Sequence, residues 1–250
     1  MLKEERRRRI LDILGQEGRV VATDLQQALG VSGYTIRRDL DELAEGRHLQ
    51  RVHGGALARS PVAPTYEGRQ SQSVPGKRAV ARAAATLLEP GQTVIVDGGS
   101  TALQLVEAIP AGHSGTFITH SPPVAAALGR RPGIEVVVVG GLLDPRAMVA
   151  VGAQAIEAYG RFTANVCFLG IWSVHAATGM SSGYYEEAEL RRVLVRRADR
   201  VVGLASRDKL GTTAQFGIAP ATALTHLATE PDVPAELLDP FAELGIHLVR

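Results

Sequence analysis

The sequence predicts an α/β protein of two domains, an N-terminal winged helix-turn-helix domain and a larger C-terminal α/β domain of Rossmann-like type. Residues 1–57 contain short amphipathic segments, then an alternating segment that leads into a Gly-Gly turn. Residues 58–76 are rich in Pro, Ser and Gln and lack sustained periodicity, which indicates a linker. Residues 77–250 alternate apolar runs with amphipathic ones, the pattern of a mainly parallel sheet covered on both faces. A chain of 250 residues has room for one small and one medium domain.

Two amphipathic helices are expected at the N-terminus. Residues 4–16 carry apolar side chains at helical spacing, behind four consecutive arginines at 6–9. A second helix is expected to open at Thr23, because Gln26 three residues later completes a capping-box pattern, and to end at the next glycine. The arginine run concentrates positive charge in a chain whose net charge is only +1, although much of it could be solvated.

A third helix is expected to follow Ser32, which can accept a free backbone N–H of the first turn. Ile36, Leu40 and Leu43 recur at spacings of four and three residues and define one buried face. The other faces carry Arg and hydroxyl groups, which can contact phosphates or base edges in a DNA major groove. The alternative interpretation of these residues alone is a solvated amphipathic helix.

A two-stranded wing is expected after this helix. Residues 49–52 alternate, residues 53–55 form a turn, and the chain resumes at residues 56–57. The turn brings Arg51 and His53 toward a phosphate backbone. The candidate DNA-binding residues are Ser32, Tyr34, Thr35, Arg37, Arg38, Arg51 and His53.

The N-terminal residues carry a family resemblance. Thr35-Ile36-Arg37-Arg38-Asp39-Leu40, followed by Arg51-Val52-His53-Gly54-Gly55-Ala56, resembles the N-terminal signature of the DeoR family of bacterial transcriptional regulators. The resemblance implies a winged helix-turn-helix that binds double-stranded operator DNA, usually as a repressor. One such module buries limited surface, so we expect a homodimer or higher homo-oligomer on paired half-sites.

The C-terminal domain is expected to consist of alternating strands and helices, assigned from runs of apolar residues and helical spacing. The predicted strands cover residues 93–97, 116–119, 134–139, 165–171, 201–205, 224–228 and 246–249, and the predicted helices start at 77 and cover 100–109, 123–128, 152–159 and 184–198.

The loop Asp97-Gly98-Gly99-Ser100-Thr101 has the chemistry of a phosphate cradle. A strand runs into two glycines, then two hydroxyl residues, then a helix N-terminus with free N–H groups. It lacks the Lys of a nucleotide P-loop, so we expect a smaller phosphate ester. The alternative is a tight strand-to-helix turn. His120, the pair Gly140-Gly141, and Lys209 follow other strands and are expected at the same edge of the sheet.

The resemblance continues through the C-terminal domain. It implies an effector domain similar in fold to ribose-5-phosphate isomerase, which senses a phosphorylated sugar or related metabolite. Residues 97–101 and Glu187 match the family pattern, whereas His120 replaces an Asn, and Asn165 and Ser206 stand where acids are usual. The candidate effector-binding residues are Asp97, Gly98, Gly99, Ser100, Thr101, His120, Gly140, Gly141, Glu187 and Lys209.

An enzymatic function is the alternative, namely a sugar-phosphate isomerase fused to a DNA-binding module. Isomerisation requires a positioned general base, for which Asp97, Glu186 and Glu187 are candidates, but no spacing compels that role. We therefore expect a regulator that is not an enzyme and has no catalytic residues, metal or cofactor. Cys167 is the only cysteine, which excludes an intramolecular disulfide. The start lacks a signal-peptide pattern and no apolar run reaches membrane-spanning length, so a cytoplasmic protein without membrane contact is expected.

Overall fold

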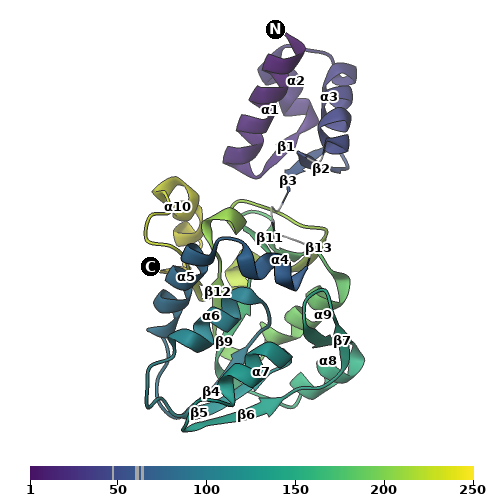
Figure 1. Cartoon of the computed structure of the whole chain (residues 1–250). Helices are drawn as coiled ribbons and strands as arrows, with labels where there is room; N and C mark the ends of the chain where they lie inside the picture. The colour runs from purple at the N-terminus through teal and green to yellow at the C-terminus, as the bar shows by residue number, and fades with distance from the viewer. Residues whose placement is uncertain (47, 60–61, 63–64) are drawn as a thin grey trace.

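A computed structural model of the chain describes residues 1–46, 48–59, 62 and 65–250. It has two domains, and the smaller N-terminal domain lies at one end of the larger one (Figure 1). The N-terminal elements are α1 (Lys3–Glu17), β1 (Arg19–Val21), α2 (Ala22–Leu29), α3 (Gly33–Glu45), β2 (Leu49–Val52) and β3 (Gly55–Ala58). β1 pairs with β3, and β3 with β2, both antiparallel. The predicted winged helix-turn-helix is confirmed, with a third strand in its sheet.

Of the two predicted helix N-caps in this domain, one is present and one is not. Ser32 is the N-cap of α3, and its hydroxyl accepts the backbone N–H of Thr35 at 3.2 Å, as predicted. Ile36 and Leu40 on the inner face are fully buried. The capping box predicted for α2 is wrong, because Val21 is the N-cap and Thr23 lies inside the first turn.

Two of the four N-terminal arginines are structural. The side chains of Arg6 and Asp39 are buried, and Arg6 Nε donates to an Asp39 carboxylate oxygen. Arg7 donates to Asp39 at 3.3 Å and also to Glu42. Hydrogen bonds from Lys3 and then Arg7 lower the pKa of Glu42 to about 2. These contacts attach α1 to α3, so only Arg8 and Arg9 of the run are exposed.

The predicted linker contains a helix. Residues 60, 61, 63 and 64 lie outside the described residues, and α4 (Tyr66–Ser71) and α5 (Val74–Ala85) follow. α5 begins three residues before the predicted start at Lys77, because a Pro occupies its first turn. The Lys77 ammonium group is buried and donates to the carbonyl groups of Arg69 and Gln72, which holds the C-terminal end of α4.

A seven-stranded parallel sheet forms the centre of the C-terminal domain. Its order is β15-β14-β12-β9-β4-β5-β6. The strands are β4 (Gln92–Val96), β5 (Gly115–Thr119), β6 (Ile134–Val138), β9 (Ala164–Gly170), β12 (Ala198–Leu204), β14 (His226–Ala228) and β15 (His247–Val249). The helices packed on it are α5, α6 (Ser100–Ala108), α7 (Pro122–Leu128), α8 (Ala153–Tyr159), α9 (Tyr185–Leu194) and α10 (Ala235–Glu243). The parallel α/β prediction is confirmed, although α9 ends four residues early and residue 198 already belongs to a strand.

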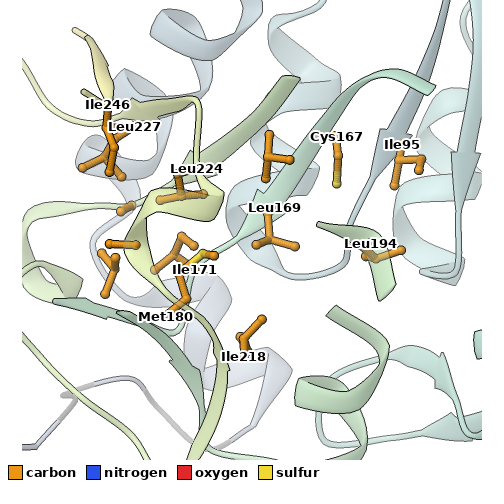
Figure 2. Packing of buried hydrophobic residues seen from close by; sticks show 14 of the residues in the cluster. Ile95, Cys167, Leu169, Ile171, Met180, Leu194, Ile218, Leu224, Leu227 and Ile246 are labelled. Atoms are coloured by element: carbon orange, nitrogen blue, oxygen red, sulfur yellow. The ribbon is translucent and has the colours of Figure 1, made fainter. Parts of the chain in front are cut away.

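The sheet separates two apolar cores because strand side chains alternate between its faces. In β9, Val166 and Phe168 pack with α5, α6 and α7, whereas Cys167 and Leu169 pack with α8, α9 and α10. Figure 2 shows the second of these cores, with Cys167 beside Ile95 of the neighbouring strand. The cysteine is a buried core residue, as expected.

Several shorter elements were not predicted. They are the β7–β8 hairpin (Leu142–Asp144 and Val149–Val151), the small antiparallel sheet of β10 (Ser173–His175), β11 (Gly179–Ser182) and β13 (Phe216–Ala219), and the 3₁₀ turns η1 (Arg207–Lys209) and η2 (Ala221–Ala223). Among the described residues no helix is long and apolar enough to span a membrane.

Candidate functional site

The order of the strands reverses between β4 and β9. From β4 the chain adds β5 and β6 on one side, and from β9 it adds β12, β14 and β15 on the other. The loops that leave these two strands therefore diverge and open a crevice at their carboxyl ends, where parallel α/β sheets bind ligands.

Asp97 joins the two strand ends below this crevice. Its side chain is fully buried, and its Oδ1 accepts the backbone N–H of Gly98 at 2.7 Å. Its Oδ2 accepts the N–H of Gly170 at 2.9 Å and Nε of Arg191 at 2.8 Å. Burial raises the pKa of Asp97, but Arg191 and His120 outweigh it and hold that pKa well below its usual range. The carboxylate is thus a fixed anion that positions the loops.

His120 contacts the Asp97 carboxylate on the side away from the crevice. Its Nε2 lies 3.3 Å from Oδ1 of Asp97, and its Nδ1 lies 2.9 Å from the hydroxyl of Tyr159. Burial raises the pKa of Tyr159 well above its ordinary value, so this hydroxyl is protonated and donates to Nδ1. The imidazole therefore donates from Nε2 to Asp97.

A pocket that opens to solvent lies above these residues. Its floor is the N-terminus of α6, where Gly99 (φ +101°) is the N-cap and Ser100 and Thr101 form the first turn. A Cβ on Gly98 would lie 2.1 Å from Cγ1 of Val149, so this position requires glycine. The first N–H groups of a helix lack intrahelical partners and carry its positive dipole end, which suits an anion.

Lys209 adds a positive charge to this end of the pocket. Its side chain is buried, and Nζ lies 3.4 Å from Oγ1 of Thr101. Burial lowers the pKa of Lys209 to about 8. The ammonium group is therefore desolvated and can bind an anion strongly when protonated.

The opposite wall is formed by α9, α4 and the loop after β9. Arg191 and Glu187 are one helical turn apart and pair at 2.6 Å. Burial lowers the pKa of Arg191, but Asp97 and Glu187 raise it above its ordinary value. The Arg69 guanidinium lies 5.2 Å from the ring centroid of Trp172, a cation–π contact.

The structure brings six of the ten predicted effector residues together. The pocket is lined by Val62, Arg69, Gly98, Gly99, Ser100, Thr101, Ala147, Val149, Gly170, Ile171, Trp172, Glu187, Arg191 and Lys209. Asp97 and His120 lie behind it, while Gly140 and Gly141 follow β6 and contribute no pocket atoms. Arg191 could have been included from its spacing to Glu187. Arg69 carries no sequence signal, because it lies in the segment interpreted as a linker.

The N-terminal domain has a groove between α3 and the wing. Arg37 of α3 and Arg51 and His53 of the wing line it, so residues separated in sequence share one concave face. The side chain of Tyr34 is 71% exposed at the start of α3, beside Ser32 and Thr35.

Two of the predicted DNA-contacting arginines have protein partners. Arg38 Nε donates to Glu42 at 3.0 Å, one helical turn away. Arg51 Nε donates to Asp41 at 2.8 Å, and its Nη1 donates to the Gly55 carbonyl. Arg37 is exposed at the groove.

Known protein families match both domains of the chain. The DeoR-like helix-turn-helix domain matches residues 6–62, and the DeoR C-terminal sensor domain matches residues 72–231. The chain is 31% identical to the HTH-type transcriptional regulator GlpR of Haloferax volcanii, over 100% of this chain and 98% of that protein. It is 29% identical to the HTH-type transcriptional regulator GolR of Listeria innocua, over 98% of each, and 25% identical to the glycerol-3-phosphate regulon repressor of Escherichia coli, over 99% of each.

Among solved structures, ribose 5 phosphate isomerase A of Neisseria gonorrhoeae aligns with a TM-score of 0.40 and 18% identity, over 53% of this chain and 52% of that one. The two domain matches together cover most of the chain, in the order in which the structure places the two domains. The chain belongs to the DeoR family of transcriptional regulators.

Proposed function

We propose that this protein is a repressor whose operator affinity changes when a phosphorylated sugar or a related phosphate ester occupies the pocket at the β4–β9 switch point. The observation that carries this proposal is the floor of the pocket. Backbone N–H groups of α6, the Ser100 and Thr101 hydroxyls and the Lys209 ammonium group converge there. These are the donors that bind a phosphate dianion.

The pocket also borders the segment between the domains. Val62 and Arg69 line it, and Arg69 Nη2 donates to the Arg146 carbonyl of the β7–β8 hairpin at 3.2 Å. A bound anion would therefore contact the chain that leads to the DNA-binding domain. An effector changes DNA affinity only if it binds the DNA-binding and non-binding states of the protein with different affinities. Contacts with Val62 and Arg69 would differ between the states if this segment moves.

A second connection runs from Lys209 to the wing. Four residues after Lys209, Thr213 donates its N–H to the Ala58 carbonyl at 3.1 Å. Ala58 in turn donates to the Gly18 carbonyl at 2.8 Å, at the end of α1. Movement of Lys209 toward a phosphate would thus act on the last residue of β3.

We propose that the DNA is read by α3 and contacted by the wing. Arg37 and Tyr34 would face the major groove, and Arg51 and His53 would face the phosphates. The remaining candidates, Ser32, Thr35 and Arg38, would assist from the helix start or through phosphate contacts. Operator binding would use a homodimer or higher homo-oligomer, and light scattering of the free protein and its DNA complex at micromolar concentration should show more than one chain.

The test uses duplexes selected by the full-length protein from a random library. The affinity for the selected operator is measured by fluorescence anisotropy, alone and with a panel of pentose, hexose and triol phosphates. We expect at least one ester to change operator affinity by roughly 5–150-fold, the usual range of coupling energies. The corresponding sugars without phosphate should have no effect. Esters that bind the protein but leave operator affinity unchanged would overturn the proposal.

We also propose that the protein is not an isomerase. Four donors are committed to the Asp97 carboxylate, namely two backbone N–H groups, Arg191 and His120, which leaves it unsuited to take a proton from a sugar carbon. Incubation with pentose and hexose phosphates should give no aldose–ketose conversion, whereas measurable turnover would favour the enzyme alternative.

A further inference from the structure

One carboxylate oxygen in the pocket wall has no hydrogen-bond donor among the described residues. Glu187 is 4% exposed, and its Oε1 is buried and unsatisfied. Its Oε2 accepts from Arg191 Nη1 at 2.6 Å, and Arg191 is itself held by Asp97 at 2.8 Å. The carboxylate cannot rotate toward another donor without breaking this buried chain of ion pairs.

A buried acceptor without a donor is unfavourable, and an ionised carboxylate can only accept. A molecule that enters the pocket lined by Glu187 can supply this donor. A phosphate dianion cannot supply it, because its oxygens also accept and its charge repels the carboxylate. An ammonium group is disfavoured by Arg69 and Arg191 in the same wall and by Lys209 at the floor of the pocket. A hydroxyl group satisfies Oε1 without either repulsion.

We propose that Glu187 Oε1 accepts a hydrogen bond from a hydroxyl group of the effector and thereby makes the pocket selective for phosphate esters of polyols. The anion would lie on Gly99, Ser100 and Thr101, and the hydroxylated part would extend toward α9. This inference rests on the proposed function and adds a specificity-determining residue to it. Inorganic phosphate and alkyl phosphates would occupy the floor of the pocket but leave Oε1 unsatisfied.

The test compares phosphate esters of equal chain length with and without hydroxyl groups. The pairs are sn-glycerol 3-phosphate with n-propyl phosphate and sorbitol 6-phosphate with n-hexyl phosphate, beside inorganic phosphate. Binding to the full-length protein is measured by titration calorimetry. At least one polyol ester should bind about tenfold or more tightly than its alkyl partner, because a hydrogen bond to a buried charged group contributes about 1.5–3 kcal/mol.

Two variants of Glu187 and one matched control identify the group responsible. Glu187→Leu removes the acceptor and should reduce the polyol preference to about threefold or less while inorganic phosphate still binds. Glu187→Gln keeps the side-chain shape and should give an intermediate preference. Glu186→Gln, an exposed neighbour on the same helix, should behave like the parent. Thermal unfolding verifies that each variant is folded. If Glu187→Leu is unfolded, the polyol preference of Glu187→Gln tests the role of Glu187.

The outcomes separate this inference from the proposed function. An unchanged polyol preference in the Glu187 variants, or no preference in the parent protein, overturns the role of Glu187 while phosphate binding stands. Failure of every phosphate compound, including inorganic phosphate, to bind the parent protein overturns the proposed function itself.

Discussion

At the scale of single residues, the proposed phosphate site includes Ser100 at the first turn of α6. Ser100→Asp places a fixed negative charge where the phosphate is proposed to lie. Like charges about 4 Å apart near a protein surface repel by about 4 kcal/mol, so phosphate-ester affinity should fall on the order of a hundredfold or more. Folding should survive, because an acidic side chain near a helix N-terminus is favourable.

The matched control is Gln104→Glu, which adds the same charge one turn further along α6. It should keep the effector response measured by operator binding, while Ser100→Asp loses it. An unchanged response in Ser100→Asp would mean that the phosphate binds elsewhere.

Lys209 should give effector binding a distinctive pH dependence. Burial holds its pKa at about 8 in the free protein, and an anion binds the protonated form. Affinity should therefore be full below pH 8 and fall by up to about tenfold per pH unit above it, as the ammonium group loses its proton. Lys209→Arg keeps its charge at every working pH, so its titration curves should lack this decline. A decline of the same size in both proteins would exclude Lys209 as its source.

At the scale of elements, α1 is attached to α3 by a buried ion pair. Arg6→Met removes the closer of the two arginines that bind the buried Asp39 carboxylate and leaves only Arg7, which should destabilise the winged domain by up to about 3–5 kcal/mol. Arg9→Met, at an exposed position of the same helix, should change stability little. Denaturant unfolding followed by circular dichroism measures both. Restoration of stability in Arg6→Met/Asp39→Leu would confirm that the unpaired charge is responsible.

The two arginines of α3 should contribute unequally to operator affinity. Arg37→Ala should lower operator affinity by about 1–3 kcal/mol if it reads a base, because Arg37 is exposed at the groove. Arg38→Ala should lower it less, since Glu42 already partly neutralises Arg38 at 3.0 Å. Anisotropy titrations at several salt concentrations measure both effects. Parent-like binding by both variants would show that α3 does not contact DNA.

At the scale of the whole molecule, hydrogen bonds connect the two domains, and one of them is made by the side chain of His175. His175 Nε2 donates to the Glu17 carbonyl at 2.7 Å, while its Nδ1 accepts from Ala177 N at 3.1 Å. Gly18 (φ +69°) permits this approach, because a Cβ there would lie 2.1 Å from the His175 ring. Both nitrogens are used only when the ring is neutral.

His175→Phe should therefore weaken the coupling between the domains. The effector should still bind, but its effect on operator affinity should shrink, because the ring no longer donates to α1. His247→Phe, at an exposed edge strand, should behave like the parent. Calorimetry and anisotropy on the same samples separate binding from coupling, and full coupling in His175→Phe would rule out this route.

The same contact has a pH dependence of known sign. Burial lowers the pKa of His175 below its ordinary value of 6.5, so the docked ring binds fewer protons than a free one. The contribution to docking is full above pH 6.5 and is lost as the pH falls through the lowered pKa. Effector coupling in the parent should weaken over that interval, whereas in His175→Phe it should not change further.

The local sequence by itself determined the helix-turn-helix, the wing and the alternation of strands and helices in the larger domain. These features depend on residues close together in the sequence. Ser32 caps α3 through the N–H of Thr35, three residues later, and successive residues of β9 alternate between the two cores. The position of the Gly-Gly-Ser-Thr loop at the start of a helix could also be predicted, because it depends on adjacent residues. Tertiary structure decided the rest.

Arg6 is structural only because α3 brings Asp39 to it, and Arg69 reaches the pocket only because the chain before α5 folds back over the sheet. Among the described residues, Glu187 has no donor for one carboxylate oxygen, because Asp97, ninety residues earlier in the chain, fixes the orientation of Arg191. Such contacts depend on which strand ends become neighbours. The β4–β9 reversal sets that arrangement, and no local pattern encodes it.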